Sequence, residues 1–314
     1  MLTSVSLVVS GLVLLVIAGE FLVRGAVNLA LRLGIPALIV GLTVVAFGTS
    51  APEMIVSIAA VLDGTPGIAL GNVIGSNTAN ILLVLGLPAL ISAIRTDEHD
   101  LRKSWAVMIA ASVLFIALAF AGPIRWPHAL ILLAGLALML WDQIRDALAH
   151  RSAARDAEAA VEGADLSLPG RWIAAYLIGG LIGLPIGAQL LVSGATDIAR
   201  AVGISETVIG LTLVAVGTSL PELMTSVMAA IRGRADLALG NVVGSNIFNI
   251  LGIVGVAGLV GPLPVEPQLL RLDLWVMLAA ALVIGPFLFR GWPITRLIGM
   301  LLIAAYAAYV WVLI

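Results

Sequence analysis

Two copies of one polar hexapeptide interrupt apolar stretches of this 314-residue chain. The first, GTSAPE, occupies residues 48–53, and the second, GTSLPE, occupies residues 217–222. Proline has no backbone N–H, so it opens the hydrogen-bond ladder of a helix and frees carbonyl oxygens in the preceding turn. With the hydroxyls and carboxylate of each hexapeptide, these carbonyls make a set of hard oxygen ligands. Such ligands suit Ca²⁺ or Na⁺ and not soft metals.

The glutamates of the hexapeptides, Glu53 and Glu222, are the central candidate ligands. An ionised side chain near the centre of a bilayer costs about 3 kcal/mol or more, and two that converge also repel each other. One divalent cation relieves both penalties, and several monovalent cations or protons could replace it, which is the physical basis of an exchange reaction. The alternative for each glutamate is a protonated, hydrogen-bonded contact between helices. The candidate hydroxyls beside them belong to Thr49, Ser50, Thr218 and Ser219.

A second duplicated motif follows each hexapeptide: GNVIGSNTAN at 71–80 and GNVVGSNIFN at 240–249. A spacing of four places the Asn, Ser and Asn of each copy on one helix face. Asn80 and Asn249, furthest along that face, are predicted to reach the site, since an amide can donate to a carboxylate or offer a neutral oxygen to a cation. For Asn72, Asn77 and their counterparts, hydrogen bonding between helices is an equal alternative. The glycines are predicted to let helices approach closely. The serines of this face are Ser76 and Ser245.

Composition indicates a polytopic membrane protein, since 61% of residues are hydrophobic and 11% charged, with a mean hydropathy of +1.15. There is no cysteine, which excludes disulfides and thiolate metal sites. A net charge of −2 leaves no large basic surface for nucleic acid. All three histidines fall in predicted loops or at the edge of one, so neither Ser50 nor Ser219 has a histidine to activate it. We therefore expect no enzyme activity and no cofactor.

The predicted fold is all-α, with ten transmembrane helices of about 20 apolar residues or more. A longer charged connection, 147–171, divides the chain into halves 1–146 and 172–314. The predicted helices are 4–31, 36–62, 67–93, 103–122, 126–146, 172–199, 205–231, 236–260, 270–289 and 294–313.

The halves are related by a repeat. Residues 40–53 align without gaps with 209–222 at ten of 14 identities, and 71–80 align with 240–249 at seven of ten; both alignments have an offset of 169. The two hexapeptides fall in the second and seventh predicted helices, an odd number of helices apart, so they must cross the membrane in opposite directions. The sequence therefore predicts two inverted five-helix repeats with a site near the midplane, as in secondary transporters.

Basic residues predict the orientation. Twelve of the 16 lie in connections on one side, and three on the other. Because basic loops stay in the cytoplasm, we predict both termini outside and the 147–171 linker inside, in a prokaryotic plasma membrane. Among other charged residues, Glu20 and Arg24 are expected to pair at i, i+4, and Asp273 is expected at the interface near a helix end.

On the paired motifs GTSAPE…GNVIGSNTAN and GTSLPE…GNVVGSNIFN, the chain resembles the cation/Ca²⁺ exchanger superfamily, and specifically prokaryotic sodium/calcium exchangers. The resemblance implies an antiporter that moves Ca²⁺ against Na⁺ through sites among the second, third, seventh and eighth helices. It implies that Glu53 and Glu222 bind Ca²⁺ and also serve Na⁺, aided by the hydroxyls named above. It also implies backbone carbonyl ligands at Ala46 and Ala215, and a sliding motion of the first and sixth helices.

The resemblance leaves some questions open. Some members, including potassium-dependent ones, carry Asp where this chain has Asn249; with Asn80 and Asn249 both neutral, K⁺-independent exchange is favoured. Proton/Ca²⁺ antiport on the same scaffold and a cation channel remain alternatives. The expected partners are Ca²⁺, Na⁺ and the lipid bilayer, and a monomer would suffice although an oligomer is compatible.

Overall fold

The chain folds into a bundle of helices. The computed structural model describes residues 2–96, 101–149, 167–201 and 215–313. Within these ranges the only non-helical pairings are two isolated antiparallel bridges, Ile94 with Ile294 and Ile124 with Leu263. Each bridge ties together two connections that are far apart in the sequence, so the all-α prediction is confirmed for the part of the chain described.

Eight described helices are long and apolar enough to span a membrane, and a ninth span results if one bent pair is counted together. The seventh predicted helix, 205–231, lies partly outside the described residues, as does most of the predicted linker 147–171. The uninterrupted spanning helices are α1 (Leu2–Leu33), α7 (Arg102–Ala121), α8 (Trp126–Ala149), α10 (Gly170–Ala201) and α18 (Arg296–Leu313).

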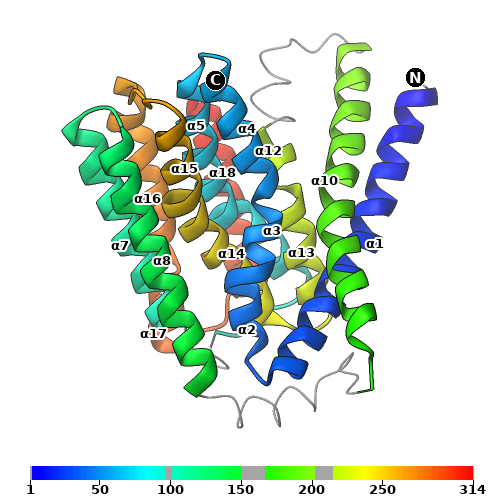
Figure 1. Ribbon diagram of the computed structural model, residues 1–314. Helices are drawn as coiled ribbons and strands as arrows, with labels where there is room; N and C mark the ends of the chain where they lie inside the picture. The colour runs from blue at the N-terminus through cyan, green and yellow to red at the C-terminus, as the bar shows by residue number, and fades with distance from the viewer. Residues whose placement is uncertain (1, 97–100, 150–166, 202–214, 314) are drawn as a thin grey trace.

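Helices α1 and α10 form a long pair at one side of the bundle (Figure 1). Their backbones approach so closely that a methyl group added at Gly11 would lie 2.5 Å from the backbone nitrogen of Leu191. Only glycine allows this separation, as in small-residue interfaces of membrane helices. Glu20 of α1 forms an ion pair with Arg232, while Arg24 lies 4.9 Å from the ring centroid of Tyr176. The prediction that Glu20 pairs with Arg24 was therefore wrong.

The two hexapeptides lie where helices break. In the first half, the chain bends by 41° where the turn ends at Ser50 and a new helix begins with Pro52 in its first turn. The second half breaks in the same way at Ser219, which has nearly the same backbone angles as Ser50. The elements are α2 (Ala37–Val40), η1 (Gly41–Val45, a π-helical turn), α3 (Ala46–Thr49) and α4 (Ala51–Leu62), then α12 (Ala215–Thr218) and α13 (Leu220–Ile231).

The second motifs form the most buried helices. In an 18-residue stretch of the span over Ala235–Val260, 89% of the residues are buried inside the bundle, whereas the share for α18 is 11%. The span over Ala235–Val260 therefore lies at the centre of the bundle and α18 at its rim. Both motif helices change to a π-helical turn at their last asparagine. The elements are α5 (Pro66–Ala79), η2 (Asn80–Val84) and α6 (Gly86–Ile91), then α14 (Ala235–Phe248), η4 (Asn249–Ile253) and α15 (Val254–Val260).

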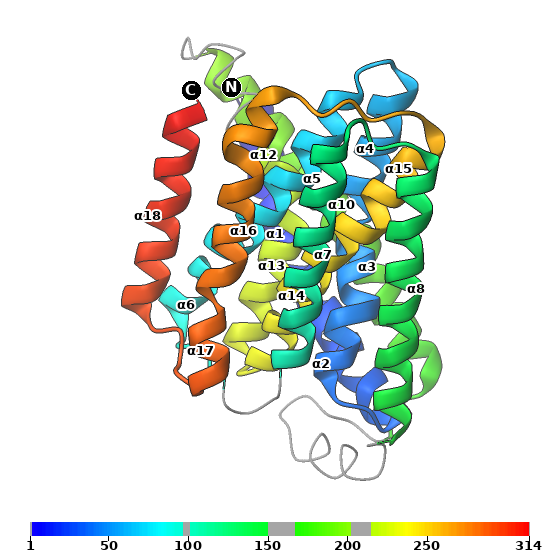
Figure 2. The same ribbon diagram turned by 90° about the vertical axis from the view of Figure 1, so that its left-hand side faces the viewer.

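Equivalent elements of the two halves run in opposite directions: α4 rises where α13 descends, and α5 descends where α14 rises (Figures 1 and 2). The prediction that the motif glycines permit close packing is confirmed in the second half, where a methyl group at Gly244 would lie 2.6 Å from the carbonyl oxygen of Leu42. It is wrong for the first half, where a methyl group at Gly71 or Gly75 would meet no described atom within 4 Å. Both ends of the chain lie at the same end of the bundle. The remaining helices are η5 (Leu269–Asp273), α16 (Leu274–Val283) and α17 (Gly285–Arg290).

Candidate functional site

Glu53 and Glu222 lie in the first turns of α4 and α13, directly after the helix breaks. Their exposed fractions are 1% and 0%. Ser50 donates to Glu222 Oε1 at 3.0 Å, so a hydroxyl of the first half contacts the carboxylate of the second. Neither oxygen of Glu53 has a hydrogen-bond partner in the described part of the chain. The two carboxylates are therefore buried with almost no compensation from the protein.

Seven buried side-chain atoms have no hydrogen-bond partner among the described residues, and all seven are oxygens. Every one belongs to a residue that the sequence predicted for the site. A buried unsatisfied polar group costs about 1–3 kcal/mol, so a cluster of them indicates a ligand that supplies positive charge. The atoms are Glu53 Oε1 and Oε2, Asn80 Oδ1, Ser219 Oγ, Glu222 Oε2, Ser245 Oγ and Asn249 Oδ1.

Asn72 and Asn241 occupy equivalent positions in the two halves, and each makes the same kind of hydrogen bonds between two helices. Asn72 Nδ2 donates to the backbone oxygen of Glu53 at 3.2 Å and to Ser57 Oγ at 3.0 Å. Asn241 Nδ2 donates to the backbone oxygen of Glu222 and to Ser226 Oγ, both at 3.2 Å. For these two asparagines, the structure therefore shows hydrogen bonding between helices, which was one of the two alternatives predicted from the sequence.

Four asparagines form a second hydrogen-bonded group across α5 and α14. Asn77 Nδ2 donates to the backbone oxygen of Asn246 at 3.1 Å, and Asn246 Nδ2 donates to the backbone oxygen of Asn77 at 3.2 Å. Asn80 Nδ2 donates to Asn246 Oδ1, and Asn249 Nδ2 donates to Asn77 Oδ1, both at 3.0 Å. The amide nitrogens of Asn80 and Asn249 are thus engaged, and their oxygens are left for another partner.

The other residues predicted for the site differ from one another in burial and in hydrogen bonding. Thr49 Oγ1 lies within donating distance of Asn241 Oδ1, at 3.2 Å, and of the Ala46 carbonyl, at 3.4 Å. That carbonyl also accepts from the Ser50 backbone N–H at 3.1 Å, so it is still part of the helix ladder. Ser76 is buried and Thr218 half-buried. Ala215 begins α12, but its side chain lies outside what the structure describes.

Sequence reasoning missed Ser57 and Ser226, which are fully buried one turn after the glutamates. Their spacing of i+4 from Glu53 and Glu222 in both halves was the signal available. The described residues contain no group of three or more His, Cys, Asp or Glu that could hold a metal ion. Among the described residues, the acidic part of the candidate site is therefore two carboxylates, and the other predicted residues offer neutral oxygens.

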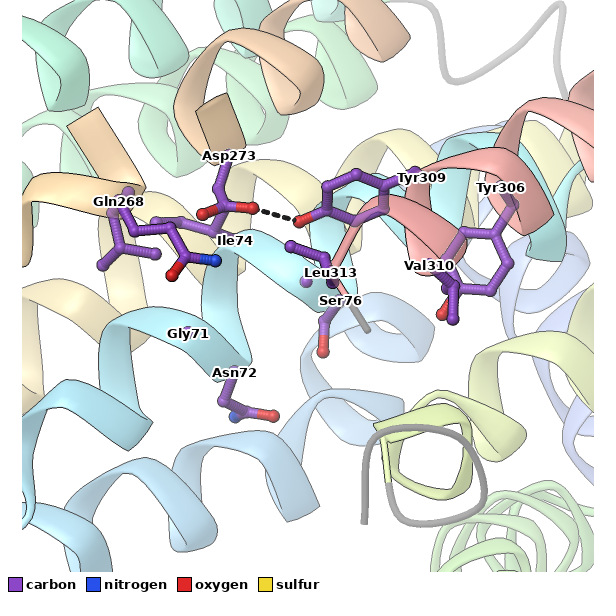
Figure 3. A pocket seen from close by; sticks show the side chains of 12 residues that line it. Gly71, Asn72, Ile74, Ser76, Gln268, Asp273, Tyr306, Tyr309, Val310 and Leu313 are labelled. Atoms are coloured by element: carbon purple, nitrogen blue, oxygen red, sulfur yellow. Dashed lines mark hydrogen bonds between the residues drawn. The ribbon is translucent and has the colours of Figure 1, made fainter. Parts of the chain in front are cut away.

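A pocket of about 280 Å³ lies beside the site, between α5, η5 and α18 (Figure 3). Asn72 and Ser76 line it from α5. Across it, Tyr309 OH donates to Asp273 Oδ1 at 2.7 Å. Asp273 is only 4% exposed, so its carboxylate is buried within the bundle, and the membrane-interface position expected for it stays a prediction.

Comparison with known proteins agrees with this geometry. The sequence model of a family described as "Sodium/calcium exchanger protein" matches residues 3–145 and 172–314. The chain belongs to this family. It is an integral membrane protein of the exchanger family, in agreement with the resemblance seen in its motifs.

Similar family members come from bacteria and archaea. The putative antiporter CaxA of Alkalimonas amylolytica is 38% identical over 320 residues, covering 100% of this chain and 99% of the relative. Inner membrane protein YrbG of Escherichia coli is 35% identical, covering 98% and 96%. The sodium/calcium exchanger MaX1 of Methanosarcina acetivorans is 35% identical, covering 96% of each chain.

Among solved structures, the sodium-calcium exchanger NCX_Mj superimposes with a TM-score of 0.85 at 35% sequence identity. The match covers 100% of this chain and 99% of that one. The fold of this family member is therefore the exchanger fold over its whole length.

Proposed function

We propose that this chain is a secondary active antiporter that exchanges Ca²⁺ for Na⁺ by alternating access, with Glu53 and Glu222 as the charged ligands. One observation carries the proposal: three of the four oxygens of the two carboxylates, and neighbouring amide and hydroxyl oxygens, are buried without partners among the described residues, in the core of an exchanger-family fold. Hard oxygens with a formal charge of −2 match one Ca²⁺.

The chain's own residues would perform the exchange through charge balance. Two ionised carboxylates buried without a bound cation are energetically costly. The ion-free protein therefore rarely changes between the conformations that open the site to either side of the membrane. One divalent cation, or Na⁺ ions in its place, neutralises the pair and lets the site pass between its two accessible states. The neutral oxygens of Asn80, Asn249 and Ser219 would complete the coordination shell of each ion. Ser76, Ser245, Thr49 and Thr218, with the carbonyls of Ala46 and Ala215, are further proposed ligands.

The proposed architecture is two inverted five-helix repeats, 1–146 and 172–314, joined by the 147–171 linker. Three observations support it: the family model matches 3–145 and 172–314 as separate segments, α4 opposes α13, and α5 opposes α14. The glycine-lined pair α1 and α10 lies outside the motif helices, where sliding would not break the site. A single chain contains all proposed ligands, so a monomer suffices.

We further propose a prokaryotic plasma membrane with both termini outside and the linker in the cytoplasm. The distribution of basic residues supports this orientation. So does the position of both chain ends at one end of the bundle. The name of the Escherichia coli relative as an inner membrane protein supports the compartment.

The test is Ca²⁺ uptake into proteoliposomes loaded with Na⁺, and into matched vesicles with a pH gradient and no Na⁺. We expect rapid uptake only when Na⁺ flows outward. Uptake driven by the pH gradient alone would instead establish the proton/Ca²⁺ alternative, which the carboxylates alone do not exclude. The sodium/calcium exchangers among the relatives favour Na⁺.

The same vesicles separate an antiporter from a channel. An antiporter takes up Ca²⁺ at a saturating rate and stops when the counter-ion is removed from the opposite side. Uptake that persists without any counter-ion and follows the membrane potential would contradict antiport. Replacing Na⁺ by a mixture of Na⁺ and K⁺ tests the expectation that K⁺ is not required.

A further inference from the structure

We propose that Asn77 and Asn246, which hydrogen-bond to each other between α5 and α14, are positioning residues that orient the amide oxygens of Asn80 and Asn249 toward the transported cation. The inference rests on the proposed function and assigns these two residues a part in ion selectivity. Neither residue has a free amide atom to offer an ion, because each side chain both donates and accepts within the group.

The bonding pattern leaves one orientation for every amide. Asn77 uses its nitrogen on the Asn246 carbonyl, with a longer contact to Met277 Sδ at 3.9 Å, so its oxygen is the end that accepts from Asn249. Asn246 uses its nitrogen on the Asn77 carbonyl, so its oxygen accepts from Asn80. Flipping any one amide would set two nitrogens or two oxygens against each other.

This bonding pattern determines where the amide oxygens of Asn80 and Asn249 point. Asn80 and Asn249 are 1% and 0% exposed, and their Oδ1 atoms have no partner in the described residues. With the amide nitrogen fixed by the other half of the molecule, the oxygen must face away from the asparagine group. An unheld amide would rotate by half a turn and present N–H groups, which repel a cation and repel a divalent one more than a monovalent one.

The orientation of each ligand is therefore set by the opposite repeat. Asn77 of α5 orients Asn249 at the end of α14, and Asn246 of α14 orients Asn80 at the end of α5. Changes at Asn77 should act mainly through Asn249, and changes at Asn246 mainly through Asn80. Loss of partners that orient a metal ligand typically costs about 10–100-fold in metal affinity.

The experiment measures the thermal stability of the full-length protein in detergent as Ca²⁺ or Na⁺ is added, because an ion that binds the folded state raises the melting temperature. The variants are N77A and N246A. The control is T78V, which removes a buried hydroxyl next to Asn77 whose hydrogen bond stays within α5, to the Ile74 carbonyl at 2.9 Å. We expect about 10–100-fold more Ca²⁺ for half the stabilisation in both alanine variants. We expect a smaller shift for Na⁺, and wild-type behaviour in T78V.

A double-mutant cycle completes the test. If Asn77 acts through Asn249, adding N77A to N249A changes the Ca²⁺ midpoint much less than adding N77A to N80A. Alanine variants that melt at lower temperature with unchanged Ca²⁺ and Na⁺ midpoints would reduce Asn77 and Asn246 to structural residues and overturn the proposal. So would equal coupling of N77A to N249A and to N80A.

Transport in vesicles is measured in parallel, so that the two proposals fail separately. A Ca²⁺ midpoint that shifts as expected, in a protein whose Ca²⁺ uptake ignores Na⁺, would overturn Na⁺/Ca²⁺ antiport and support the positioning role. Normal Na⁺-driven Ca²⁺ uptake, together with unshifted Ca²⁺ midpoints in N77A and N246A, would support Na⁺/Ca²⁺ antiport and overturn the positioning role.

Discussion

The two hexapeptides are equivalent in sequence, but the structure uses them unequally. In the second half, Glu222 accepts a hydrogen bond from Ser50, a residue of the first half. Both oxygens of Glu53, in the first half, and the hydroxyl of Ser219, the counterpart of Ser50 in the second half, have no partner among the described residues. A duplicated motif therefore supplies two sets of candidate ligands, while the tertiary structure decides which of their oxygens have a protein partner among the described residues and which do not.

The largest effect is expected from removing either carboxylate. E53Q and E222Q should each essentially abolish Na⁺-driven Ca²⁺ uptake, because a single carboxylate leaves a bound Ca²⁺ half neutralised in a buried site. The measurement is initial uptake into proteoliposomes, with folding checked by elution as a single species in detergent. Normal transport by either folded variant would show that its carboxylate is structural and end the comparison.

The inequality of the two carboxylates predicts a difference in stability. Without ions, E53Q should raise the free energy of unfolding by about 1–3 kcal/mol, because an amide can donate to oxygens that have no partner in the wild type. E222Q should stabilise less, since Glu222 already accepts from Ser50. Thermal melting in a chelator and without Na⁺ measures both. Equal stabilisation would mean that the Ser50 bond makes no difference.

The two serines sharpen the same comparison. S219A removes an oxygen that has no hydrogen-bond partner among the described residues, so it should weaken Ca²⁺ binding with little change in ion-free stability. S50A removes the donor to Glu222 and should destabilise the ion-free protein by about 1–3 kcal/mol. Melting curves with and without Ca²⁺ separate the two effects. The reverse pattern would contradict the assignment of Ser50 to the protein and Ser219 to the ion.

A smaller effect is expected from N249D. The substitution keeps a side-chain oxygen facing the ion but loses the amide donor to Asn77 Oδ1. Loss of one hydrogen bond of about 1–1.5 kcal/mol corresponds to about a tenfold change. Na⁺-driven uptake should therefore persist at about a tenth of the wild-type rate or more, well above that of E53Q. Complete loss of uptake would place Asn249 on a level with the glutamates.

The smallest effect is expected at the Glu20–Arg232 ion pair, which joins α1 to the end of α13. Its repeat counterparts, Gln189 and Asp63, cannot form the same pair. The two side chains are 26% and 40% exposed, and exposed ion pairs contribute about 0–1 kcal/mol. R232Q should therefore leave melting and Ca²⁺ uptake close to wild type, with E20Q as the matched variant. A large change in either would reveal a role in the motion of α1.

Much of the molecule was predictable because its signals are local. Apolar stretches interrupted by Gly, Pro and charge determine nearly all the spanning helices, and Pro52 and Pro221 determine where two of them break. The constant offset of 169 pairs the ligands of the halves. The failure was at a side chain whose partner is distant in the sequence: Glu20 pairs with Arg232 and not with Arg24. The hydrogen bond between Tyr309 and Asp273 likewise joins residues whose spacing gave no signal.

The sequence by itself thus determined the helical membrane fold and the candidate oxygen ligands, because hydropathy, proline and duplication act through residue type and spacing. Only the tertiary structure decided how those ligands are oriented. The amide of Asn249 is set by Asn77, and one oxygen of Glu222 is held by Ser50, each from the other half of the chain. The physical reason is that helical spacing places a side chain on a face, whereas the direction of a hydrogen bond depends on the donor or acceptor that folding brings opposite to it.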